Sequence, residues 1–385
     1  MDLIVGPVAR GDNFWDRPFI LEDLWANIES GTHTLLVAPR RVGKTSLMFR
    51  LLDQPKEDYI VLYLISESAQ RANVFWEMLF EALTEDKFIS TVEVKARKIY
   101  DKLKTIRINE AGIKGIKFGE SESVDYAKAF KEILKSFDLD KKLVIMMDEF
   151  SQTIENIIRH ESVQSAEKLL AEHRSLRQDP SIMGKVTFIY AGSIGLEGVV
   201  SSINALHSIN DLNAVKVTPL GAKEAKAFIK HLCQESNIAI NNDEINYILE
   251  KIQWHMPFYI QLIVKEIQRL YRRNPIVTIE VIDKAIKNAL DNRQYFEHWE
   301  NRLHVLAKDE KSFAKEILNI ISEHQSLESK EISNIANKYK LDEKAMKKVL
   351  RSLVYDGYIN NEIDAKTYHF NSPILRIWWY KNVAN

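Results

Sequence analysis

Residues 35–47 read Leu35-Leu36-Val37-Ala38-Pro39-Arg40-Arg41-Val42-Gly43-Lys44-Thr45-Ser46-Leu47. An apolar run, a tight turn and then Gly-Lys-Thr at the start of an amphipathic helix form the pattern of a phosphate-binding loop. The apolar run predicts a buried strand that leads into the loop. Backbone N–H groups between Ala38 and Lys44 can surround a phosphate, and the positive end of the following helix adds to the attraction.

The side chains of this loop have expected roles. Lys44 reaches the β- and γ-phosphates, and the hydroxyl of Thr45 is a ligand of Mg²⁺. The first glycine that is usual in this motif is replaced by Ala38, which the turn tolerates if this residue keeps a negative φ. We therefore expect the nucleotide to contact the consecutive residues Ala38, Pro39, Arg40, Arg41, Val42, Gly43, Lys44, Thr45 and Ser46.

Further along the chain, five consecutive apolar residues, Leu143–Met147, are followed by Asp148 and Glu149. This pattern predicts a central strand that ends in two carboxylates, at the edge where open α/β sheets bind their ligands. We expect Asp148 to hold Mg²⁺, directly or through water, and Glu149 to polarise the attacking water. With the loop upstream, these acids predict a nucleoside triphosphatase. An acidic strand-to-loop transition is the alternative interpretation.

Other polar residues near predicted strand and helix ends are weaker candidates. Ser193 ends a predicted strand over 185–193, where it either senses the γ-phosphate and positions water or caps a helix. Arg174 and Arg177 close an amphipathic helix predicted over 163–177, either as arginine fingers across a subunit interface or as solvent-facing residues. His255 either approaches the phosphates or packs at the start of a helix.

The chain before the loop predicts an apolar strap. Residues 14–19, Phe14-Trp15-Asp16-Arg17-Pro18-Phe19, lead into a helix with apolar residues at helical spacing. This strap either packs on the core or covers the adenine base. Residues 104–119 alternate around Gly112, which predicts a small inserted hairpin, with protein contact as its expected use.

The composition sets limits on the class of protein. The chain has 385 residues, 45% hydrophobic and 28% charged, which is typical of a soluble chain with two or three domains. The net charge of −1 gives no global electrostatic reason to bind nucleic acid or a membrane. The single cysteine, Cys233, excludes an intramolecular disulfide, and neither a signal peptide nor a membrane-length apolar run is visible. We therefore expect a cytoplasmic protein.

Beyond residue 218 the pattern changes to helical periods and predicts a lid and then a C-terminal domain. The fold class we predict is α/β: a P-loop NTPase with a parallel central sheet, followed by an α-helical lid and a winged-helix domain. Four helices are expected in the lid, and Pro257 suits the first turn of the third. The predicted domains are a strap over 1–30, a P-loop domain over 31–218, the lid over 219–305 and the winged helix over 306–385.

Three predicted helices and a small hairpin make up the winged helix-turn-helix. The helix that would enter a major groove, 342–355, carries Lys344, Lys347, Lys348 and Arg351. Residues 311–385 hold 12 Lys and Arg against 9 Asp and Glu, a net charge of +3, which is a mild basic bias. A winged helix used for protein contact, or as a rigid extension of the lid, is the alternative. The apolar segment 372–380 is expected to dock back on the body.

Taken together, these motifs resemble the archaeal-type ATPases, a family in the STAND branch of P-loop NTPases that is close to the AAA+ and origin-recognition ATPases. The resemblance spans nearly the whole chain. It rests on Phe14-x-x-Arg17, the loop at 39–47, Met147-Asp148-Glu149-Phe150, Ala191-Gly192-Ser193, Pro219-Leu220 and Phe370-x-Ser372-Pro373-x-Leu375-x-x-x-Trp379.

The resemblance implies ATP rather than GTP, so that the reaction is Mg²⁺-dependent hydrolysis of ATP to ADP and phosphate. It also implies that Arg17 and a lid proline, here Pro257, contribute to nucleotide binding. The family's Gly-x-Pro appears in this chain as His255-Met256-Pro257.

Three functions remain open from the sequence. The first is an ATPase switch or assembly factor that grips double-stranded DNA through its winged helix and forms a homo-oligomer on binding ATP. The second is a nucleotide-gated signalling scaffold with slow hydrolysis and a protein effector. The third is a degenerate P-loop protein that does not hydrolyse ATP, against which the intact Lys44, Thr45, Asp148 and Glu149 argue.

Overall fold

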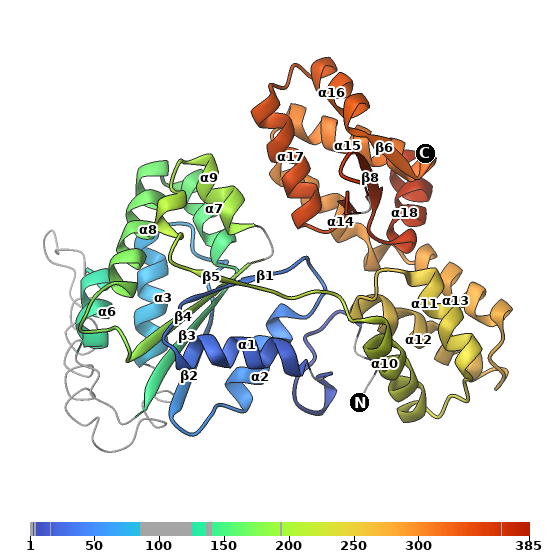
Figure 1. Cartoon of the computed structure of the whole chain (residues 1–385), viewed down its shortest axis with the longest axis horizontal. Helices are drawn as coiled ribbons and strands as arrows, with labels where there is room; N and C mark the ends of the chain where they lie inside the picture. Colours follow the sequence, from blue (N-terminus) through green and yellow to red (C-terminus); the bar gives the residue numbers. More distant parts are fainter. Residues whose placement is uncertain are drawn as a thin grey trace, which may run out of the picture. The chain divides into compact units, whose positions relative to one another are not determined.

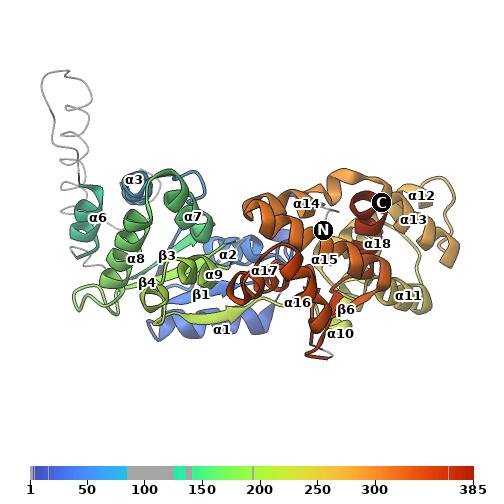
Figure 2. The same cartoon turned by 90° about the horizontal axis from the view of Figure 1, so that it is seen from above.

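The computed structural model describes residues 3, 5–15, 17–84, 125–135, 141–192, 195–362 and 364–385. The chain forms two compact units (Figures 1 and 2). The sheet unit comprises Arg17–Val37 and Leu47–Lys216, and the helical unit comprises Met1–Asp16, Ala38–Ser46 and Val217–Asn385. The hairpin predicted over 104–119 lies outside the described residues.

A five-stranded parallel sheet forms the centre of the sheet unit, in the order β2-β3-β4-β1-β5. Since all the strands are parallel, their C-terminal ends meet at one edge of the sheet. β4 separates β1, which precedes the phosphate loop, from β3, which ends at the predicted acids. The strands are β1 Thr34–Val37, β2 Tyr59–Ile65, β3 Lys142–Asp148, β4 Val186–Ala191 and β5 Asn213–Lys216.

Helices cover both faces of this sheet, as Figure 1 shows. Leu143, Ile145 and Met147 of β3 belong to the core under the larger group of helices, so the residues between them, and Asp148, lie on the opposite face. This opposite face is covered by α1 Pro18–Glu29 and α2 Lys44–Asp53. The larger group comprises α3 Ala72–Thr84, α6 Tyr126–Lys135, α7 Phe150–His160, α8 Val163–Arg177, α9 Leu196–Ser202 and the short η3 Leu206–Ser208.

In the helical unit, four helices lie within two residues of those predicted for the lid, over 221–236, 243–253, 257–273 and 278–292. The central one, α12, has nine buried residues and begins with Pro257 in its first turn, where proline is favoured. Asn241 caps α11 by accepting from the N–H groups of Asp243 and Glu244, at 2.9 and 3.0 Å. The four are α10 Ala222–Glu235, α11 Asn242–Ile252, α12 Pro257–Tyr271 and α13 Ile279–Asp291.

The last part of the chain has its helices and strands in the order required for a winged helix, with a three-stranded antiparallel sheet in the order β6-β8-β7. The strand β6 was not predicted. The elements are α14 Glu297–Arg302, α15 Lys308–His324, β6 Ser326–Glu328, α16 Ser329–Lys338, α17 Glu343–Tyr355, β7 Ile359–Asn360, β8 Thr367–Phe370 and α18 Pro373–Trp379, with short helices at Gly11–Asn13, Arg293–Tyr295, Leu303–Val305 and Tyr380–Ala384.

The apolar end of the chain docks on this unit, as expected. Trp378 and Trp379 of α18 are fully buried. The Trp378 ring stacks on Phe296, with ring centroids 5.5 Å apart and an interplanar angle of 21°. Such aromatic packing holds the C-terminal helix by burying large apolar area.

Among the helices that the structure describes, none combines the length and the apolar character needed to cross a membrane.

Arg177 lies at the edge where β1 and β5 begin, opposite the edge that carries the acids. Its guanidinium donates to both oxygens of Asp211 at 2.8 Å, to the hydroxyl of Tyr190 at 2.9 Å and to the carbonyl of Ser208 at 2.6 Å. Only 4% of the residue is exposed. These contacts speak against an arginine finger, and we correct that prediction to a structural role for Arg177. Burial raises the pKa of Asp211, but the hydrogen bonds and charge of Arg177 outweigh burial and leave that pKa below its ordinary value.

This structural role makes a prediction about Asp211→Ala. The substitution leaves the buried Arg177 charge without its carboxylate, so we expect the free energy of unfolding to fall by about 3 kcal/mol. Urea unfolding measures the loss. Arg174→Ala, one turn earlier on α8, is the control, and we expect it to change stability by less than about 0.5 kcal/mol. Equal losses in the two variants would contradict the structural role.

Gly357, which follows α17, is held where no side chain fits. Its φ is +86°, and a Cβ built on it would lie 2.5 Å from the Trp254 ring and 2.9 Å from Cβ of Pro39. Both the backbone conformation and the space therefore require glycine. Pro39 belongs to the phosphate loop, so this close approach joins the loop to the C-terminal part of its own unit.

We expect Gly357→Ala to destabilise the protein by about 2 kcal/mol beyond the cost of the positive φ, because the new methyl group forces the Trp254 ring or the loop to move. Gly184→Ala is the matched control, since Gly184 has φ +78° with open space around it. Thermal unfolding of the two variants separates the cost of the clash from that of the conformation. A Gly357→Ala variant as stable as Gly184→Ala would contradict the close contact.

Candidate nucleotide-binding site

The phosphate loop runs from the end of β1 at Val37 to the start of α2 at Lys44. Ala38 keeps a negative φ, as an alanine in the first glycine position requires. Two other residues have positive φ, Arg41 at 67° and Gly43 at 106°. The conformation of Gly43 is one that other residues rarely adopt, which explains why a glycine precedes the lysine.

Lys44 is buried at the N-terminal end of α2, with 7% of the residue exposed. Its ammonium group donates to the carbonyl of Ala38 at 3.0 Å and to that of Pro39 at 3.5 Å. The lysine charge therefore lies within the turn of the loop. Thr45 and Ser46 follow in the first turn of α2, where the positive helix end favours anions.

Arg41 is held by other parts of the helical unit. Its guanidinium lies 4.7 Å from the ring centroid of Phe258 and donates to the carbonyl of Gly6 at 3.3 Å. Burial and the neighbouring Arg40 charge lower the pKa of Arg41. A guanidinium over an aromatic face is a favourable cation–π arrangement, so α12 fixes the position of this loop residue.

Arg40 belongs to a charge cluster around the carboxylate of Asp356, at the end of α17. Asp356 is 4% exposed, and its Oδ2 lies 3.5 Å from Nε of Arg302. Burial raises the pKa of Asp356, while the charges of Arg302, Arg40 and Lys44 lower it. Burial outweighs these charges, so the pKa of Asp356 stays above its ordinary value and the three cations offset only part of the cost of burying the carboxylate. Two of the three belong to the phosphate loop.

On the sheet unit, Asp148 is the last residue of β3 and is 3% exposed. Both oxygens of its carboxylate accept hydrogen bonds at 3.0 Å. Oδ1 accepts from the N–H of Glu149, and Oδ2 accepts from the hydroxyl of Tyr63. Burial and the charge of Asp148 raise the pKa of Tyr63 far above its ordinary value, so the phenol stays protonated and remains a donor.

Glu149 turns the chain out of the sheet. Its φ is 57° and its ψ is 27°, a left-handed conformation at the N-cap of α7. This conformation ends the strict alternation of side chains along the strand. The side chains of two adjacent acids can then both lie at the same edge of the sheet, as the sequence predicts.

A hydroxyl pair fixes this strand end. The N–H and the hydroxyl of Ser66 both donate to the carbonyl of Asp148 at 3.0 Å. The hydroxyl of Thr153 in α7 donates to the carbonyl of Ser66 at 2.7 Å. Since Ser66 and Thr153 are both buried, these bonds tie the end of β2, the end of β3 and the start of α7 together in low-dielectric surroundings.

The remaining predicted residues divide between the two units or fall outside the description. Arg17 is 7% exposed and is the N-cap residue of α1, and Pro257 starts α12. Nucleotide contact by these two residues stays a prediction. The carbonyl of His255 accepts from the N–H of Leu220 at 3.0 Å. Ser193 lies outside the described residues, so its role also stays a prediction.

Trp15, in the strap before α1, packs on α10 of the helical unit. The Trp15 ring lies 5.0 Å from Phe228 and 5.5 Å from His231, both in α10. Of the two interpretations of the strap, packing is therefore observed for Trp15, within the helical unit.

The two residues predicted to bind Mg²⁺ both offer oxygen ligands, which this ion prefers. Thr45 offers a hydroxyl and Asp148 a carboxylate. Within the described ranges no group of three or more His, Cys, Asp or Glu residues is arranged to hold a metal ion. This donor set fits Mg²⁺, which binds through one or two protein ligands together with the phosphates of a nucleotide.

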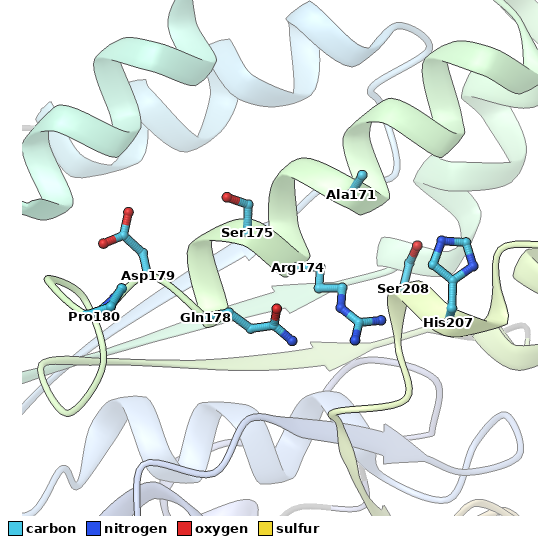
Figure 3. A pocket seen from close by; sticks show the side chains of 8 residues that line it. All are labelled: Ala171, Arg174, Ser175, Gln178, Asp179, Pro180, His207 and Ser208. Carbon is cyan, nitrogen blue, oxygen red and sulfur yellow. The ribbon is translucent and has the colours of Figure 1, made fainter.

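An open pocket of about 450 Å³ lies elsewhere, at the end of α8 (Figure 3). Arg174 and Ser175 extend from α8, Gln178 directly follows that helix, and His207 comes from η3. Since α8 ends where β4 is about to begin, this pocket lies at the edge of the sheet opposite the acids. It is therefore separate from the candidate site.

Sequence patterns did not indicate Tyr63, Ser66 or Thr153. Tyr63 and Ser66 bond to Asp148, and Thr153 bonds to Ser66, each through a pairing of segments more than 80 residues apart. Of these three residues, only Ser66 has a feature that is visible in the sequence, because it is a polar residue directly after a predicted strand. Asp356 was also missed, because it reads as an ordinary residue after a helix.

No family profile matches this chain, and no curated protein does either. Solved structures do resemble it. The Walker-type ATPase PABY2304 of Pyrococcus abyssi aligns with a TM-score of 0.65 and 19% identity, over 98% of this chain and 99% of that one. The ORC2 protein of Aeropyrum pernix, in ADPNP–ADP complexes, aligns with a TM-score of 0.59 and 10% identity, over 99% of this chain and 96% of that one.

These alignments cover nearly the whole of each chain, so the likeness extends through both units. At such low identity it is a likeness of fold. The chain thus shares its fold, a parallel sheet with a loop after β1 and the helices that follow, with the Walker-type ATPase of Pyrococcus abyssi and the ORC2 protein of Aeropyrum pernix. This α/β fold agrees with the fold class predicted from the motifs.

Proposed function

We propose that this protein binds ATP with Mg²⁺ and hydrolyses it to ADP and phosphate, as a nucleotide-dependent switch or assembly factor. One observation carries the proposal. β1, which leads into the Gly-Lys-Thr loop, and β3, which ends in Asp148 with Glu149 next, reach the same edge of one parallel sheet. This edge is where α/β sheets bind their ligands.

The residues have separate roles in this proposal. Backbone N–H groups of the loop and Lys44 bind the phosphates, where the ammonium neutralises charge on the transferred group. Thr45 and Asp148 hold Mg²⁺, which polarises the phosphate oxygens. Glu149 accepts a proton from the attacking water. Arg17 and Pro257 contribute to the nucleotide pocket, and Ser193 senses the γ-phosphate or positions the water.

Two substitutions separate binding from turnover. Lys44→Ala removes the phosphate-binding charge, so we expect ATP affinity to be lost. Glu149→Gln keeps the shape of the side chain but removes the base, so we expect ATP affinity to be kept and turnover to fall by about 10²–10⁴. Isothermal titration and phosphate release measure the two quantities.

The matched control for Lys44→Ala is Lys56→Ala, a surface lysine paired with Glu29. We expect this control to bind and hydrolyse ATP like the parent. Undiminished ATP affinity in Lys44→Ala would show that the loop assignment is wrong. Full turnover in Glu149→Gln would remove Glu149 from its role.

We further propose double-stranded DNA as the partner of the winged-helix domain. Lys344, Lys347, Lys348 and Arg351 are exposed along α17. Lys347 forms an ion pair with Glu343, and Lys348 pairs with Glu310 at 2.9 Å. The Lys347–Glu343 pair is on the surface, where it is weak enough to exchange for phosphate contacts, whereas the Glu310 carboxylate of the other pair is largely buried.

The double variant Lys347→Ala with Lys348→Ala tests this partner. Loss of two phosphate contacts should weaken DNA binding for all sequences and lower the slope of log affinity against log salt by about 2. Fluorescence anisotropy over a salt series measures both. Lys223→Ala with Lys230→Ala, two exposed lysines on α10, is the charge-matched control.

DNA binding that is absent or insensitive to salt, with ATP-dependent oligomers that still form, would contradict the DNA partner. That result would favour a signalling scaffold with a protein effector. Size-exclusion chromatography with and without ATP provides this second readout.

A further inference from the structure

Tyr63 lies beside Asp148 because of the strand register. β2 and β3 pair in parallel, with Tyr63 opposite Met146 and Ile65 opposite Asp148. Side chains two positions apart share a face of the sheet, so Tyr63 and Asp148 are diagonal neighbours on one face. Such neighbours lie within reach of a long aromatic side chain. The observed O–H···Oδ2 distance is 3.0 Å.

The phenol ring of Tyr63 is itself held in place. It packs on Phe49 of α2, with ring centroids 4.8 Å apart and an interplanar angle of 42°. α2 is the helix that starts with Lys44 and Thr45. The ring therefore spans from the helix of the phosphate loop to the carboxylate at the end of β3, within the face of the sheet that α1 and α2 cover.

The hydroxyl of Tyr63 restricts the rotation of the Asp148 carboxylate. Oδ1 is already held by the N–H of Glu149 at 3.0 Å. A second donor on Oδ2 fixes the plane of the carboxylate, since both oxygens are then engaged. Each carboxylate oxygen has more than one acceptor site, so Oδ2 can accept from Tyr63 and still face a metal ion or a metal-bound water.

We propose that Tyr63 is a positioning residue that orients the Asp148 carboxylate for Mg²⁺ of the bound nucleotide. This inference rests on the proposed ATPase function. Partners that hold a ligating carboxylate typically change metal affinity by 10–100-fold when they are removed. The hydroxyl of Tyr63 affects metal affinity alone, so nucleotide binding in the absence of metal should not depend on it.

Tyr63→Phe tests the proposal, because phenylalanine keeps the ring on Phe49 and removes only the hydroxyl. Mn²⁺, used in place of Mg²⁺, is titrated into the ADP complex of the full chain and followed by electron paramagnetic resonance. We expect Mn²⁺ affinity to fall by about 10-fold. ADP affinity in EDTA should stay within about 2-fold of the parent, as the metal-free complex makes no use of the bond.

Tyr59→Phe is the matched control. Tyr59 is on the same strand and the same face, but at the other end, where its ring packs on Trp25 with centroids 5.4 Å apart. The same atom is removed, so a general effect of losing a phenol hydroxyl would appear in both variants. We expect Mn²⁺ affinity of Tyr59→Phe to equal that of the parent.

A double-mutant cycle adds a second measurement. Once Asp148 is replaced in Asp148→Asn, removal of the Tyr63 hydroxyl should cause no further loss of Mn²⁺ affinity, since the two residues act as one unit. Additive losses would overturn the proposal. Unchanged Mn²⁺ affinity in Tyr63→Phe would also overturn it, as would a loss equal to that of Tyr59→Phe.

These measurements give a different result if the proposed ATPase function itself is wrong. In that case the parent protein binds no ADP in EDTA and no Mn²⁺ in its presence, and the positioning role falls with the function. A parent that binds both, with a Tyr63→Phe variant that binds Mn²⁺ equally well, removes the role of Tyr63 alone.

Discussion

The parallel pairing of β3 with β2 and β4 determines where Asp148 leaves the sheet and which groups it meets there. A shift of this register by one residue would move Asp148 to the other face, under α3, α7 and α8. In the observed register it lies on the face of α1 and α2, next to Tyr63. Its backbone carbonyl is held by Ser66 at the same time. Side-chain and backbone positions of the acid thus follow from one strand alignment.

Buried charge is distributed differently at the two edges of the sheet. At one edge Arg177 and Asp211 satisfy each other with two hydrogen bonds and leave no charge for a ligand. At the other edge the carboxylate of Asp148 accepts hydrogen bonds from the hydroxyl of Tyr63 and from the backbone N–H of Glu149. These two bonds fix the positions of its two oxygens.

Local patterns predicted much of this structure. The loop at 38–46, the helix over 163–177 and the strand that ends at Asp148 all depend on residues close in sequence, and the structure has them as expected. The four lid helices and the three helices after residue 306 also follow from apolar periodicity. Ala38 was correctly read as a tolerated variant, because a negative φ imposes no cost on alanine.

Contacts between distant segments could not be predicted in this way. The bond from Tyr63 to Asp148 depends on how two strands align across 85 residues, and Arg177 was misread because its partner, Asp211, lies on a later loop. The burial of Asp356 is of the same kind. A single sequence shows periodicity within a segment, whereas these pairings are fixed by tertiary packing of several segments at once.

Gly357 and its contact with Pro39 have a consequence for dividing this chain into fragments. Domain limits drawn from the sequence place the phosphate loop and residue 357 in separate pieces, yet Ala38–Ser46 packs in one unit with Val217–Asn385. A fragment that stops before residue 306 deprives Arg40 of the Asp356 carboxylate and exposes the side of Pro39 that Gly357 covers. The phosphate loop therefore has different neighbours in such a fragment, and a nucleotide affinity measured on the fragment does not describe the intact protein. Binding should be measured on the intact chain.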